Sequence, residues 1–343
     1  MKKKIWYPLS FLNPFVMLVF FYSSLFLKGG SLYIVPLFSF VLVPLIDRVV
    51  GEDKGNFSDS DYSLLEKNLF YEGLPWCLFI GILAALYLGI WVFCRGTFSI
   101  FETIGLVFSL GLVTGGLGIN LAHELGHKKG KMAQGAAQIL LAHVFYGQFF
   151  IEHNKGHHKN VSTPNDPASS RYNESFYSFF PRTLIGTFKS AYSLGFYDFK
   201  NKVFWKNHTS FLTLVSLIIA CFFCFFGGLK GLLGFLSQSF LAILLLEIIN
   251  YVEHYGLERK KNPSGRYEKV RPYHSWNSDY IFSNGLLLNL QRHSDHHAYA
   301  DRPYQNLRTH DGVPQLPWGY PTMMILALFP RLWRRFVHPL LES

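Results

Sequence analysis

Long apolar stretches fill the first third of the chain and return after residue 208, and short polar segments separate them. Six of these stretches are close to the ~20 residues that an α-helix needs to cross the hydrocarbon layer of a bilayer. They cover residues 5–27, 32–50, 74–93, 100–121, 209–228 and 232–251. The turns within successive pairs, at residues 28–30, 95–97 and 227–231, are short enough to force antiparallel neighbours. The pattern therefore predicts an all-α integral membrane protein with six transmembrane helices in three hairpins.

The polar segments that follow each hairpin are predicted to lie on one side of the membrane. Lysines at positions 2, 3 and 4 favour a cytoplasmic N-terminus by the positive-inside rule. An even number of crossings then places residues 122–208 and 252–343 on the cytoplasmic side, and these two segments hold all 14 histidines. We expect a single integral-membrane domain, residues 1–343, in which a cytosolic helical cap carries the histidines. The apolar residues 323–329 are too few to span and are predicted to lie at the membrane interface.

Composition agrees with this membrane assignment. Half of the residues are apolar and only 16% are charged, against roughly 25% in a soluble globular domain. A net charge of +10 suits nucleic acid, anionic lipid or an acidic protein. No basic segment accompanies a nucleic-acid-binding motif, so we expect lipid and an acidic protein as partners and no nucleic acid. The CxxC of Cys221 and Cys224 lies in a Phe-rich stretch, and we interpret both as buried apolar residues of a helix.

Clustered histidines are the main chemical signal. On a helix, residues i, i+3 and i+4 share a face, so each cluster predicts a chelating edge, with His158 turned away from His157. Imidazole binds iron, zinc, copper or nickel, and spacing does not distinguish them. Nine ligands exceed the about four to six that one ion takes, which predicts two metal ions. The clustered candidate ligands are His123, His127, His153, His157, His158, His293, His296 and His297. The ninth candidate, His254, stands alone at the end of the sixth predicted helix, where a single histidine is typical of an interfacial or helix-capping residue.

Other residues near these clusters have weaker expected roles. Metal-bound imidazoles commonly donate their second N–H to a carboxylate, and Glu124, Glu152, Glu253 and Asp295 are the candidates, with His274 as a further residue of this kind. The remaining histidines, His143, His208, His310 and His338, are interpreted as surface or interfacial residues.

Two other classes of protein fit part of the pattern. The HExxH string from His123 to His127 matches zinc metalloproteases, in which the glutamate is the general base, but it leaves seven clustered histidines without a role. A metal transporter would place ionisable ligands at mid-bilayer, and only Glu247 approaches that depth in the predicted helices.

The histidine strings resemble those of the membrane-bound alkane 1-monooxygenases, also called alkane hydroxylases. The matching strings are NLAHELGHKK, FFIEHNKGHHK, NYVEHYGL and LQRHSDHHA, with further similarity in TPNDPASSR, YHSWNSD and RPYQNLR. The similarity extends from about Pro44 to Pro321, most of the chain. The more distant membrane fatty-acid desaturases and hydroxylases share the three-cluster pattern.

The resemblance implies an O2-dependent enzyme that hydroxylates the terminal methyl group of alkanes to primary alcohols. It implies two iron ions, Fe2+ or Fe3+, held by the nine histidines, and a multi-pass protein of the inner (cytoplasmic) membrane whose active site faces the cytoplasm. A related di-iron hydroxylase or desaturase acting on an alkyl-aromatic or fatty-acyl substrate stays open. The alkane would enter from the bilayer through an apolar tunnel. Ser39, on the second predicted helix, is a candidate for the tunnel wall or for a hydrogen bond to a backbone carbonyl.

Electrons must come from outside the chain, because it has neither a nucleotide-binding glycine fingerprint nor iron–sulfur cysteines. The resemblance implies rubredoxin as the donor, reduced in turn by an NADH-dependent rubredoxin reductase. An acidic carrier would suit basic residues near the ligands. The candidate docking charges are Lys128, Lys129, Lys131, Lys155 and Lys159.

Overall fold

The computed structural model describes residues 2–196, 203 and 206–341. Helices dominate the described residues, which form isolated bridges, such as Glu52 with Tyr280, but no β-strand. The prediction of an all-α protein is therefore confirmed. Part of the predicted cytosolic segment 122–208 lies outside the described residues.

Five helical segments of the described chain are long and apolar enough to cross a membrane: Trp6–Leu27, Gly29–Val50, Leu69–Arg95, Ile100–His127 and His208–His254. The first includes most of α1 (Lys2–Ser10) and all of α2 (Asn13–Leu27). The second joins a 3-10 turn (Gly29–Tyr33), α3 (Ile34–Leu37), a π-helical segment (Phe38–Leu42) and α4 (Val43–Val50). The third is α6 (Leu69–Arg95), and the fourth joins α7 (Ile100–Gly111), a π-helical segment (Leu112–Ile119) and α8 (Asn120–His127). The fifth is α13 (His208–His254).

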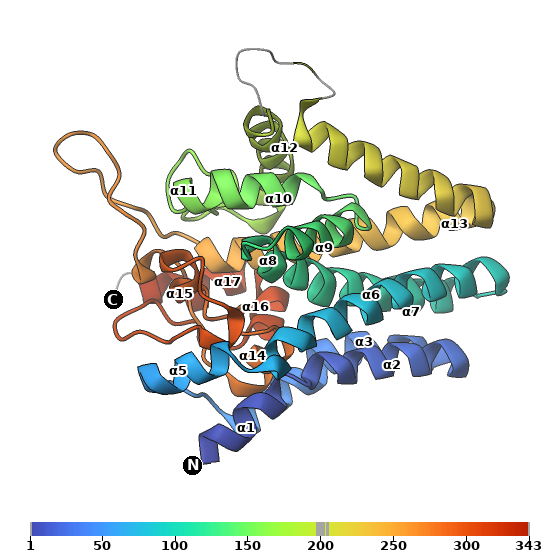
Figure 1. Ribbon diagram of the computed structural model, residues 1–343, viewed down its shortest axis with the longest axis horizontal. Coiled ribbons are helices and arrows are strands. Elements are labelled where there is room, and N and C mark those ends of the chain that lie inside the picture. The colour runs from blue at the N-terminus through green and yellow to red at the C-terminus, as the bar shows by residue number, and fades with distance from the viewer. Residues whose placement is uncertain (1, 197–202, 204–205, 342–343) are drawn as a thin grey trace.

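A glycine divides α13 into two arms. Gly228 has φ +59° and ψ −153°, a conformation that only glycine adopts without strain, and the helix reverses there (Figure 1). The two arms pack against each other, since the rings of Phe223 and Phe235 stack with centroids 5.4 Å apart. The turn predicted at residues 227–231 is thus present, and it explains how a 47-residue segment fits into the molecule.

Small residues bring the fourth apolar segment close to the second arm of α13. A methyl group added to Gly115 would lie 2.7 Å from the Cα atom of Ala242, and one added to Gly111 would lie 2.6 Å from the Cβ atom of Leu241. Small residues at positions i and i+4, such as Gly111 and Gly115, allow the backbones of two membrane helices to approach closely. Because α8 continues from the same segment and His254 ends α13, this contact sets the distance between two histidine-bearing elements.

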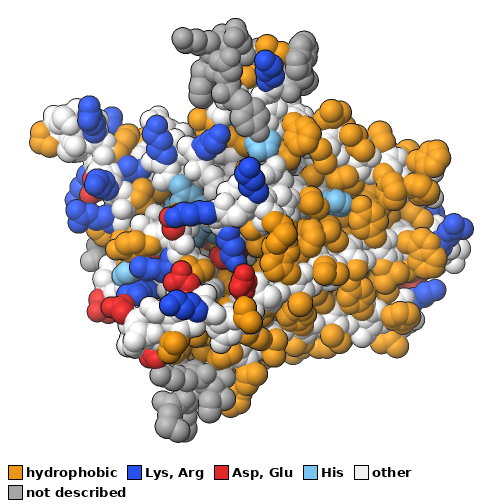
Figure 2. Space-filling view, in the orientation of Figure 1, with side chains coloured by type: hydrophobic (Ala, Val, Ile, Leu, Met, Phe, Trp, Pro, Cys, Tyr) orange, Lys and Arg blue, Asp and Glu red, His pale blue; other side chains and the backbone are white. Residues whose placement is uncertain are grey.

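The remaining helices gather around the end of the spans formed by α8 and the last turns of α13 (Figure 1). They are α5 (Asp59–Glu66), α9 (Lys131–Ala142), α10 (Gln148–Glu152), a π-helical segment (His153–His157), α11 (His158–Asn160), α12 (Phe176–Leu194), α14 (Ile281–Leu286), α15 (His293–Ala298), α16 (Tyr320–Ala327) and α17 (Pro330–Leu341), with 3-10 turns at Pro272–His274 and Tyr304–Asn306. Figure 2 shows charged side chains over this end and hydrophobic ones over the spans.

One detail differs from the sequence expectations. Cys221 and Cys224 are exposed on the outside of α13 between exposed phenylalanines, and neither is buried in the protein interior. The short apolar stretch at residues 323–329 lies mostly in α16, which packs against α13 and fully buries Met323 and Ala327.

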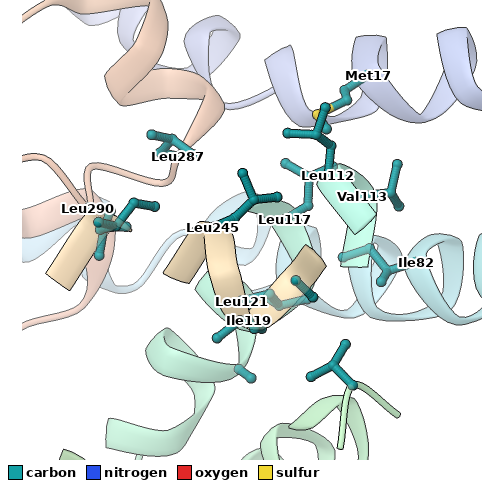
Figure 3. Close-up of a cluster of buried hydrophobic side chains, with 14 of the residues drawn as sticks. Met17, Ile82, Leu112, Val113, Leu117, Ile119, Leu121, Leu245, Leu287 and Leu290 are labelled. Carbon is teal, nitrogen blue, oxygen red and sulfur yellow. The ribbon is translucent and has the colours of Figure 1, made fainter. Parts of the chain in front are cut away.

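One hydrophobic core joins the spans to the capping segments. Leu117 and Ile119 of the π-helical segment pack with Leu245 of α13, and the same cluster includes Leu287 and Leu290 between α14 and α15 (Figure 3). The core therefore continues from the spans to the base of the histidine-bearing helices. A continuous, closely packed core has low compressibility. It therefore favours a rigid arrangement of the histidine-bearing helices.

Candidate metal centre

Nine imidazoles converge inside the capping end, and they are the nine candidates from the sequence. They divide into two groups, and within each group one ring nitrogen per histidine lies within 4.8 Å of the others. The first group contains His123, His127, His153, His158 and His296, and the second contains His157, His254, His293 and His297.

Helical geometry explains how the histidines are sorted. His293 and His297, one turn apart on α15, share the second group, while His296 turns to the first. In the π-helical segment His153–His157, the wider turn places residue i+5 near residue i, so His153 groups with His158 and not with His157. Ordinary helical spacing predicts the opposite pairing, and the π-helix is the reason for the difference.

The separations between ring nitrogens fit metal coordination. Nε2 of His153 is 3.1 Å from Nε2 of His127 and 3.0 Å from Nε2 of His158. In the second group, Nε2 of His297 is 2.9 Å from that of His293. Two nitrogens bound at right angles, each ~2.1 Å from one ion, would lie about 3 Å apart.

A second observation supports the same fit. Nε2 of His123 is buried and has no hydrogen-bond partner among the described residues. An orphaned buried nitrogen is costly unless something binds it. The residues therefore fit two metal ions, one in each group.

Burial keeps most of these imidazoles neutral, which is the form that binds metal. Desolvation, together with neighbouring imidazoles, holds the pKa values of His153, His158 and His296 well below the usual value. His157 is the exception. Burial lowers its pKa, but the charge of Asp166 and the hydrogen bond to it outweigh burial and raise the pKa overall.

Asp166 is a site residue that the sequence reasoning missed. Its Oδ2 lies 2.9 Å from Nδ1 of His157 and accepts a hydrogen bond from Ser169 Oγ at 2.5 Å, and the carboxylate is fully buried. This contact leaves Nε2 of His157 to face the second group. The sequence signal for Asp166 is its position in the TPNDPASSR string, which resembles the alkane hydroxylases but does not itself indicate a contact with a histidine.

Two of the expected carboxylates lie against the cluster. Glu253 Oε2 is 3.2 Å from Nε2 of His293, and both side chains are buried. Glu152 is buried beside the π-helical segment, where a Cβ on Gly156 would lie 2.5 Å from its Oε1. Burial, together with the negative charge of Asp166, raises the pKa of Glu152 to about 8.

The other expected residues contact different partners. Glu124 Oε1 lies 3.9 Å from Lys128 Nζ. Asp295 binds Arg302 Nη1 at 2.5 Å and His310 Nε2 at 2.6 Å, so it anchors the segment after α15 and does not contact an imidazole of the cluster among its described partners. His274 points toward Glu268, at 3.4 Å.

The remaining histidines also lie outside the two groups. His143 Nε2 is 3.0 Å from the Tyr87 hydroxyl, and His208 Nε2 is 2.8 Å from Gln138 Oε1. His338 lies between two hydroxyls, those of Tyr172 at 3.2 Å and Tyr255 at 2.9 Å. His310 was expected to be a surface or interfacial residue, but its ring forms a hydrogen bond with Asp295 beside α15.

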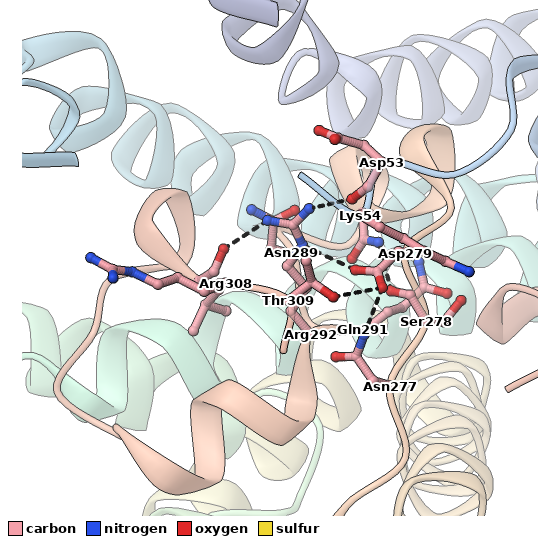
Figure 4. A network of polar contacts seen from close by, with 12 residues as sticks. Asp53, Lys54, Asn277, Ser278, Asp279, Asn289, Gln291, Arg292, Arg308 and Thr309 are labelled. Atoms are coloured by element: carbon pink, nitrogen blue, oxygen red, sulfur yellow. Dashed lines mark hydrogen bonds and ion pairs between the residues drawn. The ribbon is translucent and has the colours of Figure 1, made fainter. Parts of the chain in front are cut away.

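A buried arginine fixes the start of α15. Arg292, next to His293, donates to the carbonyl oxygens of Asp53 at 2.9 Å and Leu307 at 2.8 Å (Figure 4). Its Nε lies 3.5 Å from Asp279 Oδ1, and Asp279 also accepts from Thr309 at 2.9 Å. Three segments distant in sequence thus hold the helix that supplies three of the nine imidazoles.

A narrow cavity of about 60 Å³ leads from the apolar core to the imidazoles. Met17, Ser39, Leu112 and other apolar residues of the spans line one part of it, and His123, His153 and His293 line another. Ser39 is thus part of the wall, and its hydroxyl has no hydrogen-bond partner among the described residues. A mainly apolar cavity that ends at metal-binding side chains suits a hydrophobic molecule placed for oxidation.

The chain is similar in sequence to several known membrane oxygenases and matches one family model. The fatty acid desaturase family model matches residues 99–327. Alkane 1-monooxygenase 2 of Alcanivorax borkumensis is 41% identical over 89% of this chain and 81% of its own length. Alkane 1-monooxygenase 1 of Pseudomonas aeruginosa is 43% identical over 88% of this chain and 80% of its own. The hydroxylase component of a xylene/toluene monooxygenase from Pseudomonas putida is 26% identical over 80% of this chain and 74% of its own.

Identity of about two residues in five over most of both chains, together with the convergence of all nine histidines, leaves one assignment. The chain belongs to the alkane 1-monooxygenase family, within the broader group that the fatty acid desaturase model describes.

Proposed function

We propose that this protein is a membrane-bound alkane 1-monooxygenase that uses O2 to convert the terminal methyl group of an alkane to a primary alcohol. The observation that carries the proposal is the apolar cavity that ends at His123, His153 and His293. The cavity has no charged group along its apolar part that would bind a polar substrate. The family relationship favours an alkane over other apolar molecules.

We further propose that the nine histidines hold two iron ions, one in each group. Two irons would supply the reduction of O2 and the oxidising power that an unactivated C–H bond requires. The five-imidazole and four-imidazole groups support this stoichiometry. The zinc protease alternative gains no support, because Glu124, its required general base, lies beside Lys128 and is not among the described residues that line the cavity.

The chain itself contributes positioning, exclusion of water and charge. Asp166 fixes the ring of His157 by accepting from Nδ1, so that Nε2 stays available. The cavity wall directs a chain end toward the imidazoles and keeps water from the apolar part, since water there would find few polar partners. Glu253 and Asn250 place polar atoms at the imidazole end, where the product hydroxyl would form.

Electrons would come from rubredoxin, itself reduced by an NADH-dependent reductase. Four of the five candidate docking lysines, Lys129, Lys131, Lys155 and Lys159, are exposed on the segments that carry His127 and His158, and Lys128 is half-buried. A basic surface this close to the ligands would attract an acidic carrier and shorten the distance electrons travel.

We propose that the two arms of α13 each cross the bilayer, which gives six spans in one catalytic domain comprising residues 1–343. With the lysines at positions 2–4 in the cytoplasm, the site at residues 122–208 and 252–343 faces the cytoplasm from the inner membrane. The break at Gly228 supports the sixth span, because it lets both arms run antiparallel.

Metal analysis of the purified protein, combined with an assay on octane and a longer alkane, tests the proposal. With rubredoxin, its reductase and NADH, we expect two irons per chain and 1-alcohol as product. His293→Ala should lose iron, whereas His208→Ala, which removes a histidine outside both groups, should retain it. One zinc per chain, or iron without alcohol, would contradict the assignment. Including p-xylene tests the alkyl-aromatic alternative that the xylene/toluene relative raises.

A further inference from the structure

Tyr146 and Glu247 form a buried pair beside the metal centre that the proposed reaction does not use. The Tyr146 hydroxyl donates to Glu247 Oε1 at 2.6 Å, and each residue is 1% exposed. Glu247 Oε2 accepts from Thr183 Oγ1 at 3.0 Å and from Asn250 Nδ2 at 3.2 Å. In all three contacts the carboxylate is the acceptor. Oε1 of Glu247 is therefore placed to take the phenolic proton.

Stacked aromatic rings connect this phenol to the imidazoles. The rings of Tyr146 and Phe149 are 24° from parallel, with centroids 6.1 Å apart. The ring of Phe149 stacks in turn on His153 at 24° and 4.7 Å. Electrons tunnel readily between packed rings, so the stack is a short path from Tyr146 to the first histidine group.

The phenol is separated from the alkane cavity. Phe149 lines that cavity, whereas Tyr146 is absent from its described wall and faces a different space of about 10 Å³ with Glu152, Thr187 and Glu247. A space of that size holds at most one water molecule. Substrate in the cavity therefore does not reach Tyr146, and the ring of Phe149 stands between them.

The methionine side chains that line the cavity can be oxidised when no alkane is bound. Met17 and Met324 both line the cavity. Methionine is oxidised to its sulfoxide by strong oxidants, which turns a flexible apolar side chain into a polar one. An O2-derived oxidant formed beside an empty cavity would attack such residues unless another group reduced it first.

We propose that Tyr146 is that group, a tyrosine that reduces the O2-derived oxidant when the cavity holds no alkane. The proposal rests on the proposed function, because the monooxygenase reaction supplies the oxidant. In each event, one electron passes from Tyr146 through Phe149 and His153 to the oxidant. The phenolic O–H bond breaks, and its proton passes to Glu247 Oε1. The products are a neutral tyrosyl radical, a protonated Glu247 and an oxidant reduced by one electron.

The cycle closes with a second transfer. A one-electron carrier protein, of the class that feeds the centre during turnover, returns an electron to the radical, and Glu247 returns its proton to the phenolate oxygen. Two such events remove the two oxidising equivalents that hydroxylation would otherwise consume. No side chain is permanently altered.

Electron paramagnetic resonance after rapid freezing detects the radical. Reduced, iron-loaded protein is mixed with O2 without alkane, and the wild type should give a tyrosyl signal that narrows when its tyrosines are ring-deuterated. Tyr146→Phe keeps the stack but removes the O–H group, so the signal should be lost. Glu247→Gln keeps a hydrogen-bond acceptor that cannot take the proton, and it should lower the yield.

Tyr251→Phe is the matched control. Tyr251 is also buried, but its hydroxyl donates to the Glu174 carbonyl oxygen at 2.7 Å, and the ring lies outside the stack. This variant should keep the full signal. A radical that survives in Tyr146→Phe, or no radical in the wild type, would overturn the proposal.

Peptide mapping after the same reaction gives an independent readout. Tyr146→Phe should accumulate more sulfoxide at Met17 and Met324 than the wild type, and equal amounts would count against a protective role. Octane added to the same wild-type preparation separates the two hypotheses. Alcohol formed with octane, combined with no radical in the sample without octane, defeats the tyrosine proposal alone. Absence of alcohol with octane defeats the proposed function and the tyrosine proposal with it.

Discussion

Individual side chains hold the imidazoles of the second group in different ways. His157 has a buried carboxylate at Nδ1, whereas the partner of His254 Nδ1 among the described residues is the Ser275 hydroxyl at 3.5 Å. Nδ1 of His293 and of His297 have no hydrogen-bond partner among the described residues. The orientation of His157 is therefore the one most strongly imposed by the protein, and the second group depends on it.

Replacing Asp166 with Asn should weaken metal binding in the second group. The amide keeps the size of the carboxylate but removes the charge that orients and polarises His157. Loss of such a partner typically lowers metal affinity or activity by about 10–100-fold. Iron per chain, measured across a chelator titration, should fall for Asp166→Asn. Glu268→Gln, which removes a carboxylate beside His274 and outside both groups, should behave as wild type.

Ser39→Phe should shorten the alkanes that the protein accepts. Ser39 is 6% exposed and lines the cavity, so a ring there would fill space that the distal part of a long chain occupies. We expect lower turnover of the longer alkane and retained turnover of octane in a competition assay. Leu37→Phe is the control, because Leu37 lies on the same span but is 54% exposed. Equal loss on both alkanes would indicate general damage and contradict a length effect.

Dense histidine spacing predicted eight of the nine imidazoles, because such clusters have few structural explanations. The ninth, His254, stands alone in the sequence, and only the resemblance to the alkane hydroxylases implied it. The sequence did not identify Asp166, whose contact with His157 depends on how a loop folds back after α11. The sequence also predicted that Asp295 contacts a metal-bound imidazole, but its partners are Arg302 and His310. Both partners come from a loop, and no periodic pattern in the sequence predicts the path of a loop.

Helical elements reach the site through departures from ordinary α-geometry. Within the described residues, π-helical segments lie at Phe38–Leu42, Leu112–Ile119 and His153–His157, and each contributes residues to the cavity or to the histidine groups. A π-turn accommodates an extra residue and shifts the faces that follow. Apolar periodicity predicted where the spans lie, but a pattern read at 3.6 residues per turn does not reveal such shifts.

Adjacent glycines of one π-helical segment should respond differently to alanine. The added methyl of Gly115→Ala would meet the Ala242 backbone at 2.7 Å, so the fourth span must move from α13, at a typical cost of about 1–3 kcal/mol. Gly116→Ala adds its methyl where no atom lies within 4 Å. Thermal unfolding in detergent should show a lower Tm for Gly115→Ala only. Alanine is a better helix former than glycine, so propensity alone would not lower either Tm. A similar decrease in both variants would mean that the contact of Gly115 with Ala242 is not decisive.

The whole molecule separates a lipid-facing region from a polar capping end, and the sequence predicted this division from apolar runs and histidine placement. The number of crossings depends on Gly228, where a five-residue glycine-rich turn is the only sequence signal. The relative placement of the histidine segments was not predictable, because 140 residues separate His157 from His297, which lie 3.2 Å apart at Nε2.

Cysteine labelling tests the proposed six-span topology. In a background with Cys77, Cys94, Cys221 and Cys224 replaced, Lys230→Cys should react with a membrane-impermeant maleimide when the outer face of the inner membrane is accessible. Lys129→Cys, at the histidine end, should react only in inverted vesicles. Both lysines are exposed, so burial does not limit either reaction. Labelling of both from the same face would require an even number of crossings between them and would contradict the six-span topology.

The cavity among the spans has a kinetic consequence. An alkane partitions almost wholly into lipid, so the protein meets its substrate at a density per area of bilayer, whereas O2 and the electron carrier are also supplied from water. Adding substrate-free vesicles would dilute the alkane at constant total amount. The apparent KM, stated per volume of water, would then rise with the lipid added while the carrier dependence stayed constant. Substrate supply is thus governed by the composition of the membrane as much as by the concentration in the medium.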